Sequence, residues 1–174
     1  MLSRPSTGRF LEDLKDRIRS AQVRAAVAVN SELVLLYWNI GGRIAAAQKT
    51  QGWGVKIVPK LSADLRKAFP EMKGFSPRNL DYMLAFARVW TDEPILQQVA
   101  AKLPWFHNCV LIDKIKDEIP RHWQARHAVE FGWSRNVLVH QIESKLYERQ
   151  EKSITNFTRS LPAPKSDLAR QIID

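Results

Sequence analysis

A stretch of about forty residues with the pattern of one helix places the strongest constraint on how this 174-residue chain can fold. Apolar residues recur in it at three- and four-residue steps, which is the spacing of one side of an α-helix. They are Phe10, Leu14, Ile18, Ala21, Ala25 and Ala28, then Leu33, Leu36, Tyr37, Ile40 and Ile44. The pattern predicts one long helix from about Gly8 to Gln48. It could bend at Asn30–Ser31 or at the pair Gly41 and Gly42, where a helix is most easily deformed.

A helix of this length needs a surface to pack against, because most helical stability in proteins comes from burying an apolar face. Either the rest of the domain wraps the helix or a second copy of the chain pairs with it. The sequence leaves both alternatives open, and a homodimer is one expectation.

Residues 74–90 carry a second strong signal, a capped helix start. Ser76 is a good N-cap residue, because its hydroxyl can accept a hydrogen bond from a backbone N–H two or three residues on. Pro77 follows at the first helical position, where a missing N–H costs nothing. Phe75 and Leu80 have the spacing of a hydrophobic staple. The predicted helix has these outward residues near its start: Arg78, Asn79, Asp81 and Tyr82.

The preceding stretch, residues 55–69, is amphipathic, with its lysines and arginines on the outer side. Pro59 leaves two alternatives, a helix that begins near it or a helix that is kinked there. Together the two helices resemble a helix-turn-helix only loosely. Their connector, residues 69–75, is longer than the roughly three- to four-residue turn of the compact motif.

The second half of the chain has shorter helical patterns, over 95–101, 110–116 and 121–131, with a loop expected at 104–108. Residues 132–138 then repeat an order seen in residues 74–80: glycine, aromatic, serine, an Arg-Asn pair and leucine. This echo predicts another capped helix, from Ser134 to about Lys152. It is either a structural duplication or only a shared capping requirement.

The expected architecture is therefore all-α, with a long N-terminal helix packed on a helical bundle that contains the loose helix-turn-helix. We expect this domain to cover residues 8–153. Residues 154–174, which include Leu161-Pro-Ala-Pro, are expected to be a linker.

The charge of the chain favours a polyanionic partner. The net charge is +9 and the isoelectric point is about 9.9. Residues 1–90 hold 15 basic and 7 acidic residues, whereas residues 91–174 hold 12 and 11. The excess thus lies in the half that contains the capped helix. An exposed Arg-Asn pair at a helix start is what a major-groove reader presents. The alternative is a core helix whose polar side is merely solvated.

Several classes of site are not expected. Cys109 is the single cysteine, which leaves no disulfide framework and no thiolate metal cluster. The four histidines have no ligand spacing, so we expect neither metal nor cofactor. The longest apolar run, residues 33–38, is too short to cross a bilayer, and no signal peptide precedes it. A cytoplasmic protein without membrane contact is the default expectation.

Several short sequence words, in the same order, make the chain similar to the N-terminal domain of the YhcG family. The resemblance spans roughly residues 20–170. Phe106 and Cys109 depart from the glycine and aliphatic residue expected there, and Pro59 stands where a plain helix former is usual. The matching words are Asn30–Leu33, Tyr37–Gly41, Gly52–Gly54, Leu65–Pro70, Gly74–Leu80, Leu103–Trp105, His107–Asn108, Gly132–Asn136 and Gln141–Ser144.

This resemblance implies a bacterial protein in which a helical domain precedes a PD-(D/E)xK-type nuclease domain that is absent here. It also implies a DNA-handling context, with a nuclease or defence-system subunit as a partner. Glu71-Met-Lys73 mimics the E-x-K word of such nucleases and Asp64 precedes it. Both lie in helix or turn patterns, whereas the metal site of that class lies at strand ends. We therefore expect that this chain alone is not an enzyme.

Two functional hypotheses remain. The first is a DNA-binding module, with phosphate contacts from basic residues and base contacts from the helix that starts at Ser76. The second is a dimerisation or protein-docking scaffold, suggested by the long helix and by six tryptophans: Trp38, Trp53, Trp90, Trp105, Trp123 and Trp133. A third reading is RNA binding through exposed aromatics. The residues assigned to DNA binding are Lys56, Lys60, Arg66, Lys67, Lys73, Ser76, Arg78, Asn79, Tyr82, Arg135 and Asn136.

Overall fold

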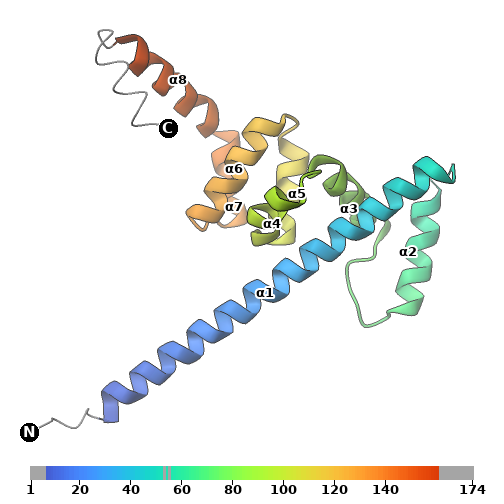
Figure 1. Ribbon diagram of the computed structural model, residues 1–174, viewed down its shortest axis with the longest axis horizontal. Coiled ribbons are helices and arrows are strands. Elements are labelled where there is room, and N and C mark those ends of the chain that lie inside the picture. Colours follow the sequence, from blue (N-terminus) through green and yellow to red (C-terminus); the bar gives the residue numbers. More distant parts are fainter. Residues whose placement is uncertain (1–6, 53, 55, 161–174) are drawn as a thin grey trace, which may run out of the picture. The chain divides into compact units, whose positions relative to one another are not determined.

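The computed structural model of the chain describes residues 7–52, 54 and 56–160, with Trp53 and residues 161–174 of the expected linker outside that part. Every described element is helical and none is a strand (Figure 1), which confirms the all-α prediction. The elements are α1 (Thr7–Thr50), α2 (Ile57–Ala68), α3 (Pro77–Val89), α4 (Glu93–Gln98), the 3₁₀-helix η1 (Ala100–Lys102), α5 (Trp105–Lys114), α6 (Glu118–Glu130), α7 (Arg135–Glu143) and α8 (Leu146–Ser160). None of the described helices is long and apolar enough to cross a membrane.

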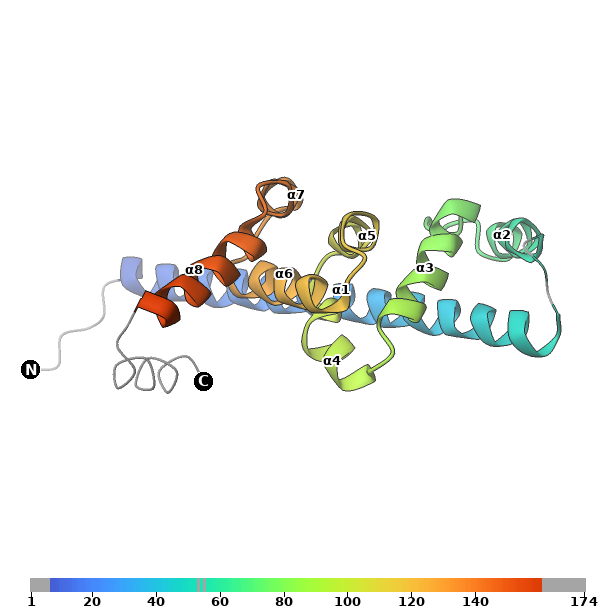
Figure 2. The ribbon, with the colours of Figure 1, turned by 90° about the horizontal axis from the view of Figure 1, so that it is seen from above.

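The chain forms two compact units, residues 1–109 and 110–174. In the first unit, α1 is one continuous helix that runs through both glycines (Figure 2), as predicted. Its two parts differ in environment. Residues 8–29 are exposed throughout, whereas from Asn30 onward one side of α1 packs on α3 and η1. We expected α1 to have a surface to pack against along its full length. Within the first unit, only the second part of α1 has one.

The crossing of α1 and α3 forms the core of the first unit. Val34 of α1 lies against a fully buried set from α3 and its end: Leu80, Met83, Phe86 and Trp90. Gly41 lies where α1 meets the backbone of Met83, so closely that a Cβ atom would overlap the Met83 carbonyl. The Trp38 indole donates a hydrogen bond of 2.7 Å to the carbonyl of Trp90, just past the end of α3. A close glycine contact and this hydrogen bond thus accompany the apolar packing at the crossing.

Helix α2 settles the alternative at Pro59. The helix begins at Ile57, so Pro59 lies in its first turn, where a backbone N–H has no intrahelical partner to lose. Ser62 of α2 is buried and its hydroxyl donates to the carbonyl of Phe75 at 2.6 Å. Phe75 lies in the connector between α2 and α3. This bond holds the connector against α2, and the helix–connector–helix arrangement expected for residues 59–90 is present.

The loop expected at residues 104–108 is wrong, because α5 already begins at Trp105. The local sequence is poor in helix formers, and long-range packing overrides it. The Trp105 ring meets the rings of Tyr37 and Phe86 edge-on, with centroids 4.8 and 5.2 Å apart. The buried Asn108 side chain donates to the carbonyl of Ala100 at 3.0 Å, which fixes the first turn of α5.

The second unit contains α6, α7 and α8, and it corrects another prediction. The single helix expected from Ser134 to Lys152 is divided at Lys145, whose φ of 55° no α-helix accommodates. The break changes the direction of the chain between α7 and α8. Tyr147 of α8 then contacts Trp123 of α6, with ring centroids 5.5 Å apart. Packing between the helices thus decides where α7 ends.

Candidate nucleic-acid interface

The start of α3 is built as its sequence predicts. The Ser76 hydroxyl accepts a hydrogen bond of 3.2 Å from the backbone N–H of Asn79, and Phe75 and Leu80 are both buried as a staple. Arg78 is exposed, and its guanidinium lies 5.8 Å from the centroid of the Tyr82 ring, a cation–π geometry. The cap therefore places one arginine and one aromatic ring at the surface beside the positive end of the α3 dipole.

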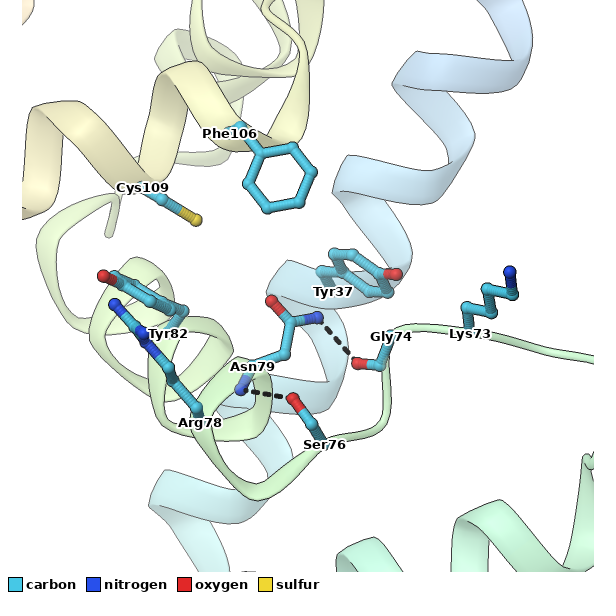
Figure 3. Close-up of a pocket in the computed structure, with 9 residues that line it drawn as sticks. All are labelled: Tyr37, Lys73, Gly74, Ser76, Arg78, Asn79, Tyr82, Phe106 and Cys109. Atoms are coloured by element: carbon cyan, nitrogen blue, oxygen red, sulfur yellow. Dashed lines mark hydrogen bonds between the residues drawn. The ribbon is translucent and has the colours of Figure 1, made fainter.

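Asn79 does not point outward as expected. Its side-chain N–H donates to the carbonyl of Gly74 at 2.6 Å (Figure 3), and its carbonyl oxygen accepts from the Trp105 indole at 2.8 Å. Trp105 is buried, so Asn79 supplies a partner that this indole needs. The Arg-Asn pair is thus divided in role. Arg78 faces the surface, whereas Asn79 joins the connector to α5, and we remove Asn79 from the candidate base contacts.

Basic residues from the end of α2 and from the connector meet around a concave surface of about 600 Å³, which we call the cationic groove. Its lining includes Arg66 and Lys67 from the last turn of α2, Lys73 from the connector and Ser76 at the start of α3. Met72 and Phe75 add apolar surface to it. The structure therefore brings together four of the residues that the sequence assigned to DNA binding.

Three side chains that line the cationic groove are positively charged. Within the described part of the chain, Arg66, Lys67 and Lys73 form no ion pair, and all three are exposed. Three basic residues of the exposed part of α1 differ, since Lys15, Arg17 and Arg19 each pair with a carboxylate one turn away, at 2.8, 2.8 and 3.2 Å. The cationic groove thus gathers three positive charges, none of which forms an ion pair with a carboxylate that the structure describes.

A second concave surface of about 660 Å³, which we call the aromatic pocket, adjoins the groove (Figure 3). The two share Lys73, Gly74 and Ser76, so the connector runs between them. The rest of the pocket lining comes from α1, α3 and α5: Tyr37, Arg78, Asn79, Tyr82, Phe106 and Cys109.

Gly74 and Tyr37 set the shape of the aromatic pocket. Gly74 has a φ of 111°, which favours glycine, and a Cβ atom there would overlap the Tyr37 hydroxyl. Burial raises the pKa of the Tyr37 phenol, and the neighbouring Cys109 thiol raises it further. The hydroxyl therefore stays protonated at neutral pH.

Sequence reasoning missed two parts of this pocket. Tyr37 reads as an ordinary inward residue of α1, and Phe106 falls in the stretch that was expected to be a loop. The one available signal was Phe106 itself, a large aromatic residue beside the buried Trp105. Phe106 is 64% exposed in the structure.

The remaining candidates lie elsewhere. Lys56 and Lys60 are exposed on the first turn of α2 and line neither concave surface. Arg135 and Asn136 are exposed at the start of α7 in the second unit, where Ser134 accepts from the N–H of Val137 at 3.3 Å. The echo therefore extends to the cap. The two helix starts differ in the environment of the asparagine, because Asn79 is partly buried and Asn136 is exposed.

The nuclease-like word, Glu71-Met-Lys73, has no strand around it among the residues that the structure describes. Glu71 and Lys73 lie in the connector and Asp64 lies on α2, as expected. Among the described residues, no group of three or more His, Cys, Asp or Glu side chains is placed to hold a metal ion.

Comparison with known proteins decides the family. Residues 13–149 match the DUF1016 N-terminal domain. The chain belongs to this family. The match covers most of the chain and confirms the resemblance to the YhcG N-terminal domain drawn from the sequence words. No curated protein and no solved structure matches the chain. The comparisons therefore give the family of the chain but no function. A function has to be argued from the surfaces described above.

Proposed function

We propose that this DUF1016 N-terminal domain is a non-catalytic DNA-binding module that serves a nuclease domain. The observation that carries the proposal is the convergence of Arg66, Lys67 and Lys73 on one groove, where no carboxylate of a described residue pairs with them. Exposed lysines and arginines that are not neutralised by the protein are the groups that replace counterions on the phosphate backbone. Lys73 acts in this reading as a phosphate contact and not as part of a nuclease centre.

The start of α3 completes the surface. Ser76, the N-cap of α3, lines the same groove as the cations, so the positive end of the α3 dipole lies beside them, and a helix N-terminus favours a phosphate oxygen. Arg78 lies in the first turn of α3, is exposed, and has its guanidinium over the Tyr82 ring. In this proposal it is the residue nearest to the bases. Lys56 and Lys60 extend the phosphate contacts along α2. Across residues 56–82 the sequence holds six basic and three acidic residues, so the region as a whole is positive.

The test is a salt-titrated binding assay with duplex DNA of mixed sequence. The triple variant Arg66→Ala, Lys67→Ala, Lys73→Ala should weaken binding by roughly 10- to 100-fold near 0.1 M salt. It should also flatten the slope of log K against log salt by about 2 to 3, since each phosphate contact contributes about 0.9.

The matched control removes the same charge elsewhere, in the variant Lys102→Ala, Lys116→Ala, Lys152→Ala, whose three side chains are also exposed. Its slope should change little. Equal losses in the two triple variants would show that net charge alone drives binding, and would remove the groove as the interface.

We also propose that the exposed part of α1 pairs with the same helix of a second copy. Six residues follow the alternating three- and four-residue steps of a coiled-coil seam, and form what we call the α1 stripe: Leu11, Leu14, Ile18, Ala21, Ala25 and Ala28. All six are exposed in the single chain, and Leu11 and Ile18 are 50% and 57% exposed. A helix of this length gains most of its stability from a packed face, and the first unit provides none for residues 8–29.

The charges beside the stripe favour a second copy as the occupant. Lys15, Arg17 and Arg24 flank the seam, and the first two are neutralised within their own helix, by Glu12 and Asp13. Two copies could therefore approach without strong repulsion between their flanks.

Sedimentation of the chain at micromolar concentrations tests this pairing. Ile18→Glu should convert a dimer to a monomer, because it places a charge in the seam. Val23→Glu is the control, since Val23 is 62% exposed on the opposite side of the helix and should not affect association. A chain that sediments as a monomer at every concentration would exclude the pairing.

A further inference from the structure

The aromatic pocket and the cationic groove lie on the two sides of one short segment. Lys73, Gly74 and Ser76 line both. Tyr37, Tyr82 and Phe106 line only the first cavity, and Arg66 and Lys67 line only the second. A ligand that crossed this segment would meet cations on one side and rings on the other. A nucleotide has this division, with its phosphate at one end and its base at the other.

The rings of the pocket are arranged to take a flat group. Figure 3 shows the Phe106 ring projecting from α5 across the space above Asn79, with Tyr82 and Arg78 on the opposite side. Phe106 is exposed although it is large and apolar, and it lies beside a cavity of about 660 Å³. That volume is within the range of roughly 300–1,000 Å³ found for small-molecule sites. An aromatic ring and an arginine plane both stack on nucleobases.

A base in a duplex cannot reach such a pocket, because its faces are covered by the neighbouring base pairs. Only a base that is unpaired, in a single strand, a bulge or an extruded position, can enter. We propose that the aromatic pocket takes the base of an unpaired nucleotide, while Lys73, with Arg66 and Lys67, holds the adjoining phosphate. This inference rests on the proposed function and adds the kind of nucleic acid that the module prefers.

Two of the polar groups at the pocket are already engaged within the protein. The Asn79 amide already has one hydrogen bond at each end, to Gly74 and Trp105, and the Tyr37 phenol is buried against Gly74. Stacking is therefore the main interaction, and stacking tolerates every base because each has a π-face. We expect recognition of an unpaired state and not of a sequence.

The experiment compares four fluorescently labelled probes: a 12-nucleotide single strand, its matched duplex, the same duplex with one bulged nucleotide, and the single strand as RNA. The chain should bind the single strand and the bulged duplex more tightly than the matched duplex. Phe106→Ala should weaken binding to both of those probes by roughly 5- to 100-fold, the range for losing one stacked base, and leave the matched duplex unchanged. Phe106→Trp should retain the preference.

The control is Phe131→Ala. Phe131 is 60% exposed, close to the 64% of Phe106, but belongs to the second unit. Its loss should leave all four affinities unchanged. A single-strand affinity that Phe106→Ala does not alter would overturn the nucleotide pocket. Equal weakening by the two phenylalanine variants would overturn it too. The RNA probe separates the two sources of an unpaired base. If the chain binds the RNA strand more weakly than the DNA strand, the pocket is assigned to DNA. If it binds the RNA strand more tightly, the pocket is assigned to RNA.

The triple charge variant keeps this inference distinct from the proposed function. If it weakens all four probes while Phe106→Ala weakens none, DNA binding stands and the nucleotide pocket does not. If the chain binds no probe at low salt, both the proposed function and the nucleotide pocket fall.

The reactivity of Cys109 provides a second measurement, which reports whether the base lies in the aromatic pocket. It is the single cysteine of the chain, and its sulfur points into the aromatic pocket in Figure 3. A saturating single strand should slow alkylation of Cys109 by a thiol reagent, and a strand of abasic residues should slow it much less. Equal protection by the two strands would place the base elsewhere.

Discussion

Replacing Gly41 with alanine should lower the free energy of unfolding of the first unit by about 3 kcal/mol, at the upper end of the cost of overpacking. The added Cβ atom would overlap the backbone carbonyl of Met83, and backbone cannot move aside as a side-chain end can. Helices α1 and α3 would have to separate, which would loosen the packing around Leu80 and Phe86. The loss exceeds the gain of roughly 1 kcal/mol that alanine offers over glycine within a helix.

Gly42→Ala is the matched control, because it changes the same residue type in the next position of the same helix. Gly42 has no atom within 4 Å of its expected Cβ position, and it is exposed. This variant should be more stable by about 0.5–1 kcal/mol. Urea titration followed by tryptophan fluorescence and far-UV circular dichroism measures both. Equal stabilities for the two variants would mean that α1 and α3 do not approach at Gly41.

Asn79→Ala should cost about 2–3 kcal/mol, because it leaves two partners without their hydrogen bonds. The Trp105 indole N–H is part of a buried ring and loses the acceptor that it reaches at 2.8 Å. The carbonyl of Gly74 loses its donor, and with it the bond that fixes the connector before α3. The same urea titration measures the effect.

Asn136→Ala is the control for this prediction, since Asn136 holds the corresponding place in the second capped helix start but is exposed. A change within about 0.5 kcal/mol is expected, as for most surface substitutions. Should Asn136→Ala cost as much as Asn79→Ala, the asparagine would serve local capping in both helices. The link from α3 to α5 would then not explain the effect.

Helices whose signals are local were predictable from the sequence. The long α1 followed from apolar spacing, and the start of α3 followed from Ser76, Pro77 and the staple of Phe75 with Leu80. These signals act within a few residues, so they can be read without knowing what the helix packs against. The resemblance to the family was drawn from the same kind of information, short words of sequence in a fixed order, and the match over residues 13–149 confirms it.

Elements held by distant partners were not predictable in this way. The first turn of α5 was expected to be a loop, because its helical state depends on Tyr37 and Phe86 meeting Trp105. The end of α7 at Lys145 depends on Tyr147 reaching Trp123. In both places the energy of packing exceeds the weak local preference of the residues.

The candidate site divides along the same line. The sequence by itself determined that basic residues precede a capped helix, since charge and capping are properties of neighbouring residues. Only the tertiary structure decided that Asn79 turns inward, because the indole it accepts from lies 26 residues further along the chain. It also decided that Tyr37 and Phe106 enclose one pocket beside the cations, because they come from separate helices that only packing brings together.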